Sequence, residues 1–329
     1  MKETTKKYRL TEETITINNV ILHRIEYLRA ISEYVEAGDY GGYVESEKNL
    51  SQEGECVILH EAKVSGDAVI KDDAAVFGDA QVSGKAIVRE KAQVYGDAIV
   101  CGKAIIDDHA EVYGYTIVCG RAWVRDDAKI DDHAQVYGYA QVYGTAKVYG
   151  DAEIYGDAKV YDHAEVYNNA KVYGDAEVDD YAKVYGNAKV YGYAKVSDNA
   201  KVYDNTQVYG AAKLYEYAKI YGYAEVYDHA QVDDTAEVYG DAQVYECAKV
   251  YDTARVFGNA KVYGSAEVIE KAKVYGNAQV YDDARVYDDA EVYGDAVVCG
   301  DEIVCGDEKI DNQIKWAKQN LQEVQRLKE

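Results

Sequence analysis

Apolar and polar positions alternate along most of the chain with a strict period of six residues. Every sixth residue from Ala62 to Ala296 is alanine, apart from Thr116 and Thr206, and an aliphatic residue follows two positions later, as Val64 follows Ala62. The residue between the two is usually Lys, Glu or Gln. Because side chains alternate between the faces of a strand, the alanine and the aliphatic residue share a buried face and the residue between them faces water. Each hexad therefore predicts one short strand.

The links between these strands carry a second period, of 18 residues. Gly, Asp and Asn dominate the links and supply the backbone freedom that a sharp corner needs. In one link of every three, the corner residue is acidic instead of glycine, as at Asp108, Asp126, Asp162, Asp180, Asp198, Glu216, Asp234, Asp252, Glu270 and Asp288. Three hexads thus make one coil, and such short strands form a core only when coils stack. We predict an all-β, triangular parallel β-solenoid with 18 residues per coil and about 13–14 coils.

The extent of the repeat divides the chain into three segments. Residues 56–308 are predicted to form the solenoid. Residues 1–55 are irregular and are expected to cap the first coil, because an open end exposes strand edges. Within them, Thr14–Leu22 alternates like a strand or hairpin, and His23–Val35 predicts a short helix. Residues 309–329 predict an amphipathic α-helix that covers the last coil or, alternatively, binds a partner.

The pattern of an aliphatic residue, three others and then alanine resembles the hexapeptide repeat of the hexapeptide-transferase-like superfamily. Three N-terminal stretches, Lys7–Thr11, Gly41–Ser46 and Asn49–Gln52, are similar to a bacterial and phage-borne subgroup of that superfamily. Members of the subgroup are often labelled transferases on fold alone. The resemblance implies a left-handed, single-stranded β-helix and a tendency to form trimers.

Composition and charge are consistent with a solenoid and narrow the range of functions. The chain has 35 Tyr, 2 Phe and no Pro, and a proline deletes a ladder hydrogen bond from any coil that it enters. Its net charge of −24 argues against direct binding to nucleic acid or to an anionic membrane. No apolar run approaches membrane-spanning length and the first residues are polar, so we expect no membrane span, no secretion signal and a cytoplasmic location with reduced thiols.

Stacking converts two corners into tyrosine ladders. One ladder includes Tyr137, Tyr155, Tyr173, Tyr191 and Tyr209, and the other includes Tyr149, Tyr167, Tyr185, Tyr203 and Tyr221. Two interpretations are open. The ladders stabilise the fold in place of the missing Leu and Phe, or they offer a flat aromatic surface to a protein or a carbohydrate.

The acidic corner becomes a column of carboxylates about 5 Å apart. Their mutual repulsion is expected to raise their pKa values, which makes the fold more stable near pH 5 than near pH 8. The column is interpreted as a solvated acidic binding edge, with calcium bridging as the alternative. We predict no cofactor and no resident metal, since the cysteines lack zinc-like spacing. Cys101 and Cys119, one coil apart, are close enough for a disulfide.

An outward-facing apolar patch is predicted on the first coils. One face carries Val69, Ile87, Ile105 and Trp123, and the neighbouring face carries Ile99 and Ile117. Either the N-terminal segment folds over this patch, or the patch is a homo-oligomer interface. The family resemblance favours a trimer, and a dimer is the alternative.

The sequence offers no clear catalytic residue. Acyltransferases of the superfamily, by resemblance, use a histidine in a cleft between subunits and often a loop extruded from the coil. The repeat has no interruption, and His109, His133, His163 and His229 occupy corner positions where Asp or Asn stands elsewhere. We interpret them as turn residues. Phosphate-loop, dinucleotide-binding and nucleophile-elbow motifs are absent from the sequence.

Three functions remain. The favoured one is a non-catalytic scaffold that binds a protein partner, or itself, through the acidic edge and the tyrosine ladders. The second is a DNA mimic that inhibits a nucleic-acid-binding protein, such as an anti-phage defence protein, because the predicted solenoid carries about half the charge density of DNA. The third is an acyltransferase.

Overall fold

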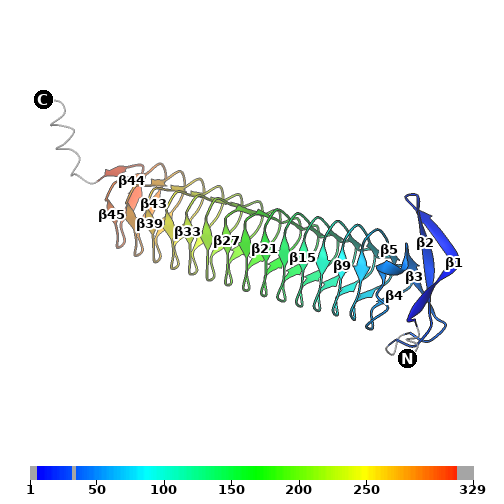
Figure 1. Ribbon diagram of the computed structural model, residues 1–329. Helices are drawn as coiled ribbons and strands as arrows, with labels where there is room; N and C mark the ends of the chain where they lie inside the picture. Colours follow the sequence, from blue (N-terminus) through cyan, green and yellow to red (C-terminus); the bar gives the residue numbers. More distant parts are fainter. Residues whose placement is uncertain (1–5, 32–34, 317–329) are drawn as a thin grey trace. The chain divides into compact units, whose positions relative to one another are not determined.

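The computed structural model describes residues 6–31 and 35–316, in two units, Met1–Asn169 and Ala170–Glu329. Each unit contains a parallel β-solenoid of 18-residue coils (Figure 1). A coil places one short strand on each of three faces, and each strand pairs in parallel with the strand 18 residues later, as Ile87 pairs with Ile105. The predicted fold class is confirmed.

We number the three faces by sequence phase and apply the same numbers in both units. In unit 1, face 1 contains β5 (Lys63–Val64), β8 (Gln81–Val82), β11 (Ile99–Val100), β14 (Ile117–Val118), β17 (Gln135–Val136) and β20 (Glu153–Ile154). Face 2 contains β6 (Val69–Ile70), β9 (Ile87–Val88), β12 (Ile105–Ile106), β15 (Trp123–Val124), β18 (Gln141–Val142) and β21 (Lys159–Val160). Face 3 contains β4 (Val57–Ile58), β7 (Ala75–Val76), β10 (Gln93–Val94), β13 (Glu111–Val112), β16 (Lys129–Ile130), β19 (Lys147–Val148) and β22 (Glu165–Val166).

Unit 2 repeats this order. Its face 1 contains β23 (Lys171–Gly174), β26 (Lys189–Gly192), β29 (Gln207–Val208), β32 (Glu225–Val226), β35 (Gln243–Val244), β38 (Lys261–Val262), β41 (Gln279–Val280), β44 (Val297–Cys299) and β47 (Ile314–Trp316). Face 2 contains β24 (Glu177–Val178), β27 (Lys195–Val196), β30 (Lys213–Leu214), β33 (Gln231–Val232), β36 (Lys249–Val250), β39 (Glu267–Val268), β42 (Arg285–Val286) and β45 (Ile303–Val304). Face 3 contains β25 (Lys183–Val184), β28 (Lys201–Val202), β31 (Lys219–Ile220), β34 (Glu237–Val238), β37 (Arg255–Val256), β40 (Lys273–Val274), β43 (Glu291–Tyr293) and β46 (Lys309–Asp311).

The core of each unit follows the predicted alternation. Ala104 and Ile106 are fully buried, while Ile105 between them points outward and is half-buried. The same holds for the repeat alanines and for the Val, Ile or Leu two positions later, all of which have no solvent exposure. Removing this apolar area from water is the main stabilising term of the fold.

The corners require left-handed backbone. Gly144 has φ +70°, and a Cβ built on it lies 2.7 Å from the amide nitrogen of Asp162 in the next coil. Asp126, at the equivalent corner one coil earlier, has φ +59°. Asp and Asn tolerate this conformation better than most residues because their short side chains bond locally, which explains why they alternate with glycine at the corners.

The N-terminal cap is a β-hairpin that continues face 1. Strands β1 (Tyr8–Ile17) and β2 (Val20–Tyr27) pair antiparallel around Asn18 and Asn19, whose φ angles of 51° and 66° suit a tight two-residue hairpin turn. Strand β3 (Tyr40–Val44) pairs antiparallel with β2 and parallel with β5. A short 3₁₀ helix, η1 (Glu47–Asn49), follows. The cap therefore covers the edge that face 1 would otherwise expose.

The helix predicted for His23–Val35 is wrong. His23–Tyr27 belongs to β2, where Leu22, Ile25 and Tyr27 are buried. Pairing of β2 with both β1 and β3 satisfies its backbone and overrides the local helical pattern. Residues 32–34 lie outside the described residues.

The predicted C-terminal helix is also wrong where the structure describes it. Lys309–Asp311 forms β46 and Ile314–Trp316 forms β47, which pair in parallel with β43 and β44. The exposed edges of the preceding coil offer unpaired backbone groups, and strand pairing satisfies them. The remainder of the predicted helix, residues 317–329, lies outside the described residues.

Candidate functional surface

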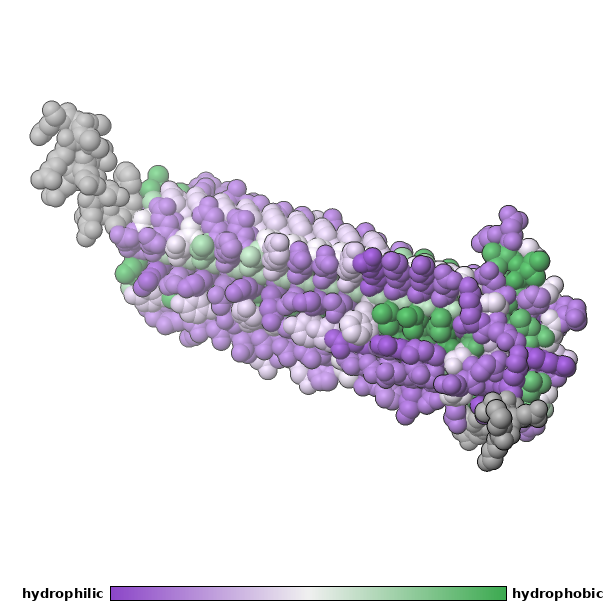
Figure 2. Space-filling model, viewed as in Figure 1, coloured by the Kyte–Doolittle hydropathy of each residue, from purple (hydrophilic) through white to green (hydrophobic). Residues whose placement is uncertain are grey.

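The outward positions of face 2 in unit 1 form an apolar strip. Its members are Val69, Ile87, Ile105 and Trp123, in register on four successive coils. Each is half-buried, and the next two outward residues of this face are Gln141 and Lys159. Figure 2 shows hydrophobic surface framed by hydrophilic residues on the side of the molecule where β9 and β15 are labelled in Figure 1. Four of the six predicted patch residues thus lie together.

Ile99 and Ile117 lie apart from the strip, on face 1. They pair with each other in register and are half-buried. The hairpin of the cap lies beside the start of the same face, where Ile17, Leu22, Lys63 and Gln81 help to line a pocket of about 140 Å³. The structure thus places the six residues on two faces, as the sequence predicted.

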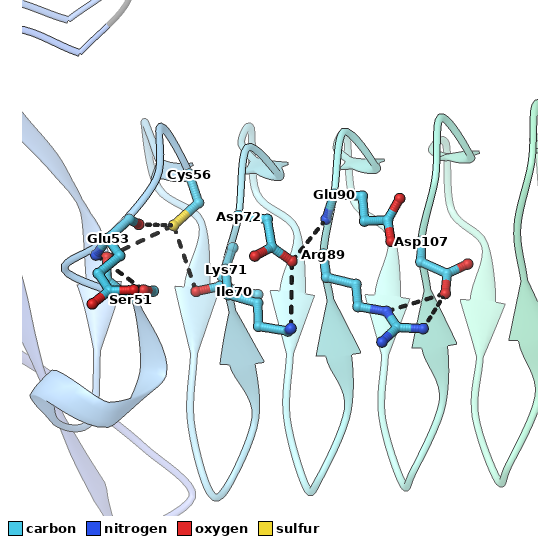
Figure 3. Close-up of polar contacts among 9 residues, drawn as sticks. All are labelled: Ser51, Glu53, Cys56, Ile70, Lys71, Asp72, Arg89, Glu90 and Asp107. Atoms are coloured by element: carbon cyan, nitrogen blue, oxygen red, sulfur yellow. Dashed lines mark hydrogen bonds and ion pairs between the residues drawn. The ribbon is translucent and has the colours of Figure 1, made fainter.

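A buried carboxylate fixes the indole of the strip. Asp107, only 3% exposed, accepts the Trp123 Nε1–H at 3.1 Å through Oδ1. Its Oδ2 accepts hydrogen bonds from Arg89 Nε at 3.1 Å and Nη2 at 2.6 Å (Figure 3). The Arg125 guanidinium lies 4.7 Å from the centroid of the Trp123 ring. Asp107 was not among the predicted site residues, although it is an acidic residue at a position that is Lys or Arg in the neighbouring coils.

The acidic corner residues have a structural role that the sequence did not reveal. Their carboxylates accept hydrogen bonds from the amide of the equivalent corner in the next coil, as Asp126 Oδ2 does from Gly144 N at 3.0 Å. Asp288 Oδ2 accepts from Gly306 N at 2.8 Å in the same way. The corner amide lacks a ladder partner of its own, and the carboxylate satisfies it. Acidic residues at the other two corners, such as Asp132 and Glu246, repeat the contact.

Two glutamates of the acidic column interact with the carboxyl of the next coil. The pKa of Glu90 is raised, chiefly by hydrogen bonding to the Asp108 carboxyl, and the pKa of Glu270 is raised in the same way by Asp288. Glu90 is followed by Lys91 and preceded by Arg89, so its charge is partly offset. The expected upward shift thus applies to these two carboxyls, where one side chain reaches the next.

The aromatic ladders are confirmed. In unit 1, Tyr137 stacks on Tyr155 and Tyr149 on Tyr167, with ring centroids 5.0 and 4.9 Å apart. In unit 2, one ladder includes Tyr173, Tyr191 and Tyr209, and the other includes Tyr185, Tyr203 and Tyr221. The sequence analysis missed a further stack, Phe77–Tyr95–Tyr113, and the pair Tyr143–Tyr161.

The stacking geometry limits what the ladders can bind. The planes of neighbouring rings lie within about 10° of parallel, so each face of a ladder ring is covered by the next ring. The ladders present ring edges and hydroxyl groups to the outside, as where Tyr95 Oη donates to Glu111 Oε2 at 3.1 Å. A sugar ring could stack only at a ladder end, which favours the stabilising interpretation.

The remaining candidate groups stay scattered. His133 stacks on Tyr115 with centroids 5.2 Å apart, and His163 is hydrogen-bonded to Thr145. Cys101 and Cys119 are free thiols, and burial together with the neighbouring Cys119 raises the pKa of Cys101 to about 11. Within residues 6–31 and 35–316, no group of three or more His, Cys, Asp or Glu side chains is placed to hold a metal ion. No helix in that part of the chain is long and apolar enough to cross a membrane.

The cap contains one buried cation. The Lys7 Nζ lies 2.9 Å from the Cys56 carbonyl oxygen and 3.0 Å from Cys56 Sγ, and it has no solvent exposure. Burial lowers the pKa of Lys7 and raises that of Cys56. The Cys56 thiol also contacts the carbonyl oxygens of Ser51 and Ile70 (Figure 3). These contacts fasten the start of β1 to the first coil.

The architecture places this chain among β-solenoid repeat proteins. Residues 278–290 match a family model described as the YdcK beta solenoid repeat. No curated protein matches the chain. The match spans a single stretch of unit 2 and supports the repeat architecture.

Proposed function

We propose that the protein is a non-catalytic scaffold that binds a basic macromolecular surface through the acidic edge of unit 2. One observation carries this proposal: seven successive corners of that unit are acidic. They are Asp180, Asp198, Glu216, Asp234, Asp252, Glu270 and Asp288, all with φ between 54° and 60°. Coils one strand spacing apart, about 4.8 Å, set these carboxylates in a straight row.

Hydrogen bonds hold the row in place. Asp234 Oδ2 accepts from Asp252 N, and Asp252 Oδ2 from Glu270 N, both at 3.2 Å. Each bond uses one carboxylate oxygen and leaves the group exposed or half-exposed to solvent. A row of fixed charges attracts a complementary row of Lys or Arg. Because the carboxylates are already ordered, this protein loses little side-chain entropy on binding.

The experiment is affinity capture from lysate of the source cell with matched variants. The triple variant Asp234→Asn, Asp252→Asn and Asp288→Asn keeps the amide-accepting oxygens and removes three charges. The control, Glu177→Gln, Glu225→Gln and Glu267→Gln, removes three charges from strand centres of unit 2. We expect the wild type and the control to capture basic proteins. The triple variant should not capture them. The same captured set with all three proteins would overturn the proposal.

DNA mimicry is a second candidate, favoured by the regularity of this row. The carboxylates recur every ~4.8 Å, compared with ~3.4 Å for the phosphates of one DNA strand. Under this function the proteins captured are DNA-binding proteins, and duplex DNA competes them off the scaffold. Capture that duplex DNA does not reduce would exclude mimicry and leave the scaffold function in place.

A further inference from the structure

The apolar strip is unusual for its position in the repeat. On face 3 of the same unit the equivalent outward residues include Glu111, Lys129 and Lys147. The coil can form with any residue at the outward position, because the buried Ala and Val side chains and the backbone ladder are the same on every face. Four successive apolar residues on face 2 therefore need an explanation other than folding.

The strip is also rigid. Its strands are joined by ladder bonds, such as Ile87 N to Ala104 O at 2.9 Å and Ile105 N to Ala122 O at 2.9 Å. The Trp123 indole is fixed by Asp107 on one side and lies against Arg125 on the other. A surface that is already ordered loses little conformational entropy when it is covered.

The two borders of the strip carry opposite charge. Lys85, Lys103 and Arg121 precede β9, β12 and β15 and form the cationic border; all three are exposed. Asp67, in the equivalent position before β6, is paired with Lys48 at 2.8 Å. Neither Lys85 nor Lys103 has an ion-pair partner within 4.0 Å among the described residues. The acidic border, on the opposite side, is formed by Glu90, Asp108 and Asp126.

Arg89 and Arg125, on the acidic side, are already engaged, whereas Lys91 next to Glu90 is exposed. Arg89 is bound to Asp107 at 2.6 Å. Arg125 lies over the rings of Trp123 and Tyr143, 4.7 and 4.4 Å from their centroids. Its contact with Asp126, at 3.9 Å, is long. On balance the charge left unpaired is positive on one border and negative on the other, where Lys91 offsets one of the three carboxylates.

We propose that the apolar strip joins two copies of this chain in a parallel, face-to-face homodimer. A two-fold axis parallel to the stacking direction of the coils sets each strip residue against its own counterpart. The same axis exchanges left and right, so it sets the cationic border of each copy against the acidic border of the other. Lys85 then faces Glu90 of the second copy, Lys103 faces Asp108, and Arg121 faces Asp126.

The charges select this arrangement over the antiparallel one. A two-fold axis perpendicular to the stacking direction sets the cationic border against itself, which places like charges opposite each other. Face-to-face sheets lie about 10 Å apart, within the combined reach of a lysine and a glutamate. The strip extends over about 15 Å, which corresponds to a small interface, so we expect a reversible dimer that depends on protein concentration.

The test is the oligomeric state of the purified full chain by sedimentation velocity over a range of protein concentrations. We expect a monomer–dimer equilibrium that weakens with added salt. Ile105→Glu should raise the dissociation constant by roughly 30-fold, as expected when a central interface residue is lost. The matched control is Ile117→Glu, an outward isoleucine of the same unit on face 1; it should leave the equilibrium unchanged. Circular dichroism of both variants confirms that each one folds.

Charge exchange tests the orientation. Lys85→Glu and Glu90→Lys should each weaken the dimer, and the double variant should restore it. A short bismaleimide cross-linker, which spans the distance of about 10 Å between facing sheets, should join two copies of an Ile105→Cys variant. The yield of cross-linked dimer for Ile117→Cys should not exceed that of the wild type. A monomer at every concentration, a trimer, or a dimer that Ile105→Glu does not weaken overturns the proposal. Failure of the double variant to restore the dimer overturns the parallel arrangement.

Discussion

Trp123 donates its indole N–H to Asp107 Oδ1 at 3.1 Å, one coil away, and thereby anchors a half-buried aromatic residue to a buried carboxylate. We expect Asp107→Ala to lower the free energy of unfolding by about 2 kcal/mol, because the Arg89 guanidinium and the indole lose their common acceptor. Asp107→Asn keeps an acceptor for the indole and should cost less. Urea unfolding, followed by Trp123 fluorescence in a Trp316→Phe background, measures both. Equal losses for Ala and Asn would contradict the role assigned to the acceptor oxygen.

The corner carboxylates predict a second effect on stability. Asp126 accepts the Gly144 amide at 3.0 Å and has φ +59°. Asp126→Ala should cost about 1–2 kcal/mol, because the amide loses its acceptor and alanine is strained at positive φ. Asp126→Asn should leave the free energy of unfolding nearly unchanged. The loss for Asp126→Gly should lie between those of Asn and Ala, because glycine avoids the strain but does not restore the acceptor. Thermal unfolding of the three variants gives this order; Asn as harmful as Ala would refute the capping role.

The core predicts a stabilising substitution. Thr116 replaces a repeat alanine, and its buried Oγ1 has no hydrogen-bond partner among the described residues. Thr116→Ala should raise the free energy of unfolding by about 1 kcal/mol. Thr206, the other exception, donates to Tyr203 O at 2.9 Å. Thr206→Ala is therefore the control and should give a smaller gain or none in the same urea titration.

The stability of the fold should depend on pH through the Glu270 carboxyl. Its pKa is raised above the ordinary value of 4.5 by the Asp288 carboxyl, so its ionisation opposes folding once the pH exceeds that value. Glu270→Gln retains the oxygen that accepts Asp288 N and removes the charge. We expect a higher Tm than the wild type at pH 8 and an equal Tm at pH 4. A difference that persists at pH 4 would show that the effect is not electrostatic.

The raised pKa values of the buried tyrosines predict that the fold loses stability at alkaline pH. Burial raises the pKa of Tyr221 and Tyr227 to about 12, from 10.0 in an exposed tyrosine. The unfolded chain thus loses phenolic protons first, so this contribution to stability is complete below pH 10 and declines as the pH rises to 12. Absorbance at 295 nm and circular dichroism should change together over that range. Phenolate formation by Tyr221 and Tyr227 near pH 10 with the fold intact, detected as absorbance that a Tyr221→Phe, Tyr227→Phe variant lacks, would contradict this prediction.

The sequence by itself determined the solenoid, because its two periods are local. A period of six places Ala and Val on one side of each short strand, and a period of 18 fixes how many strands close a coil, so the stacking of Tyr191 on Tyr209 could be predicted without a structure. The ends could not be predicted in this way. His23–Tyr27 and Ile314–Trp316 are strands because neighbouring edges offer unpaired backbone groups, and no local pattern records such a neighbour.

Only the tertiary structure decided what the charged residues do. The sequence identified the acidic column, and the structure showed that Asp126 satisfies an amide 18 residues away. It also showed that the Asp107 carboxylate accepts the indole N–H of Trp123. These contacts join residues on different coils, and their geometry depends on how the coils stack. The sequence thus set the register of the coils, whereas side-chain pairing across them set the surface on which the proposed function depends.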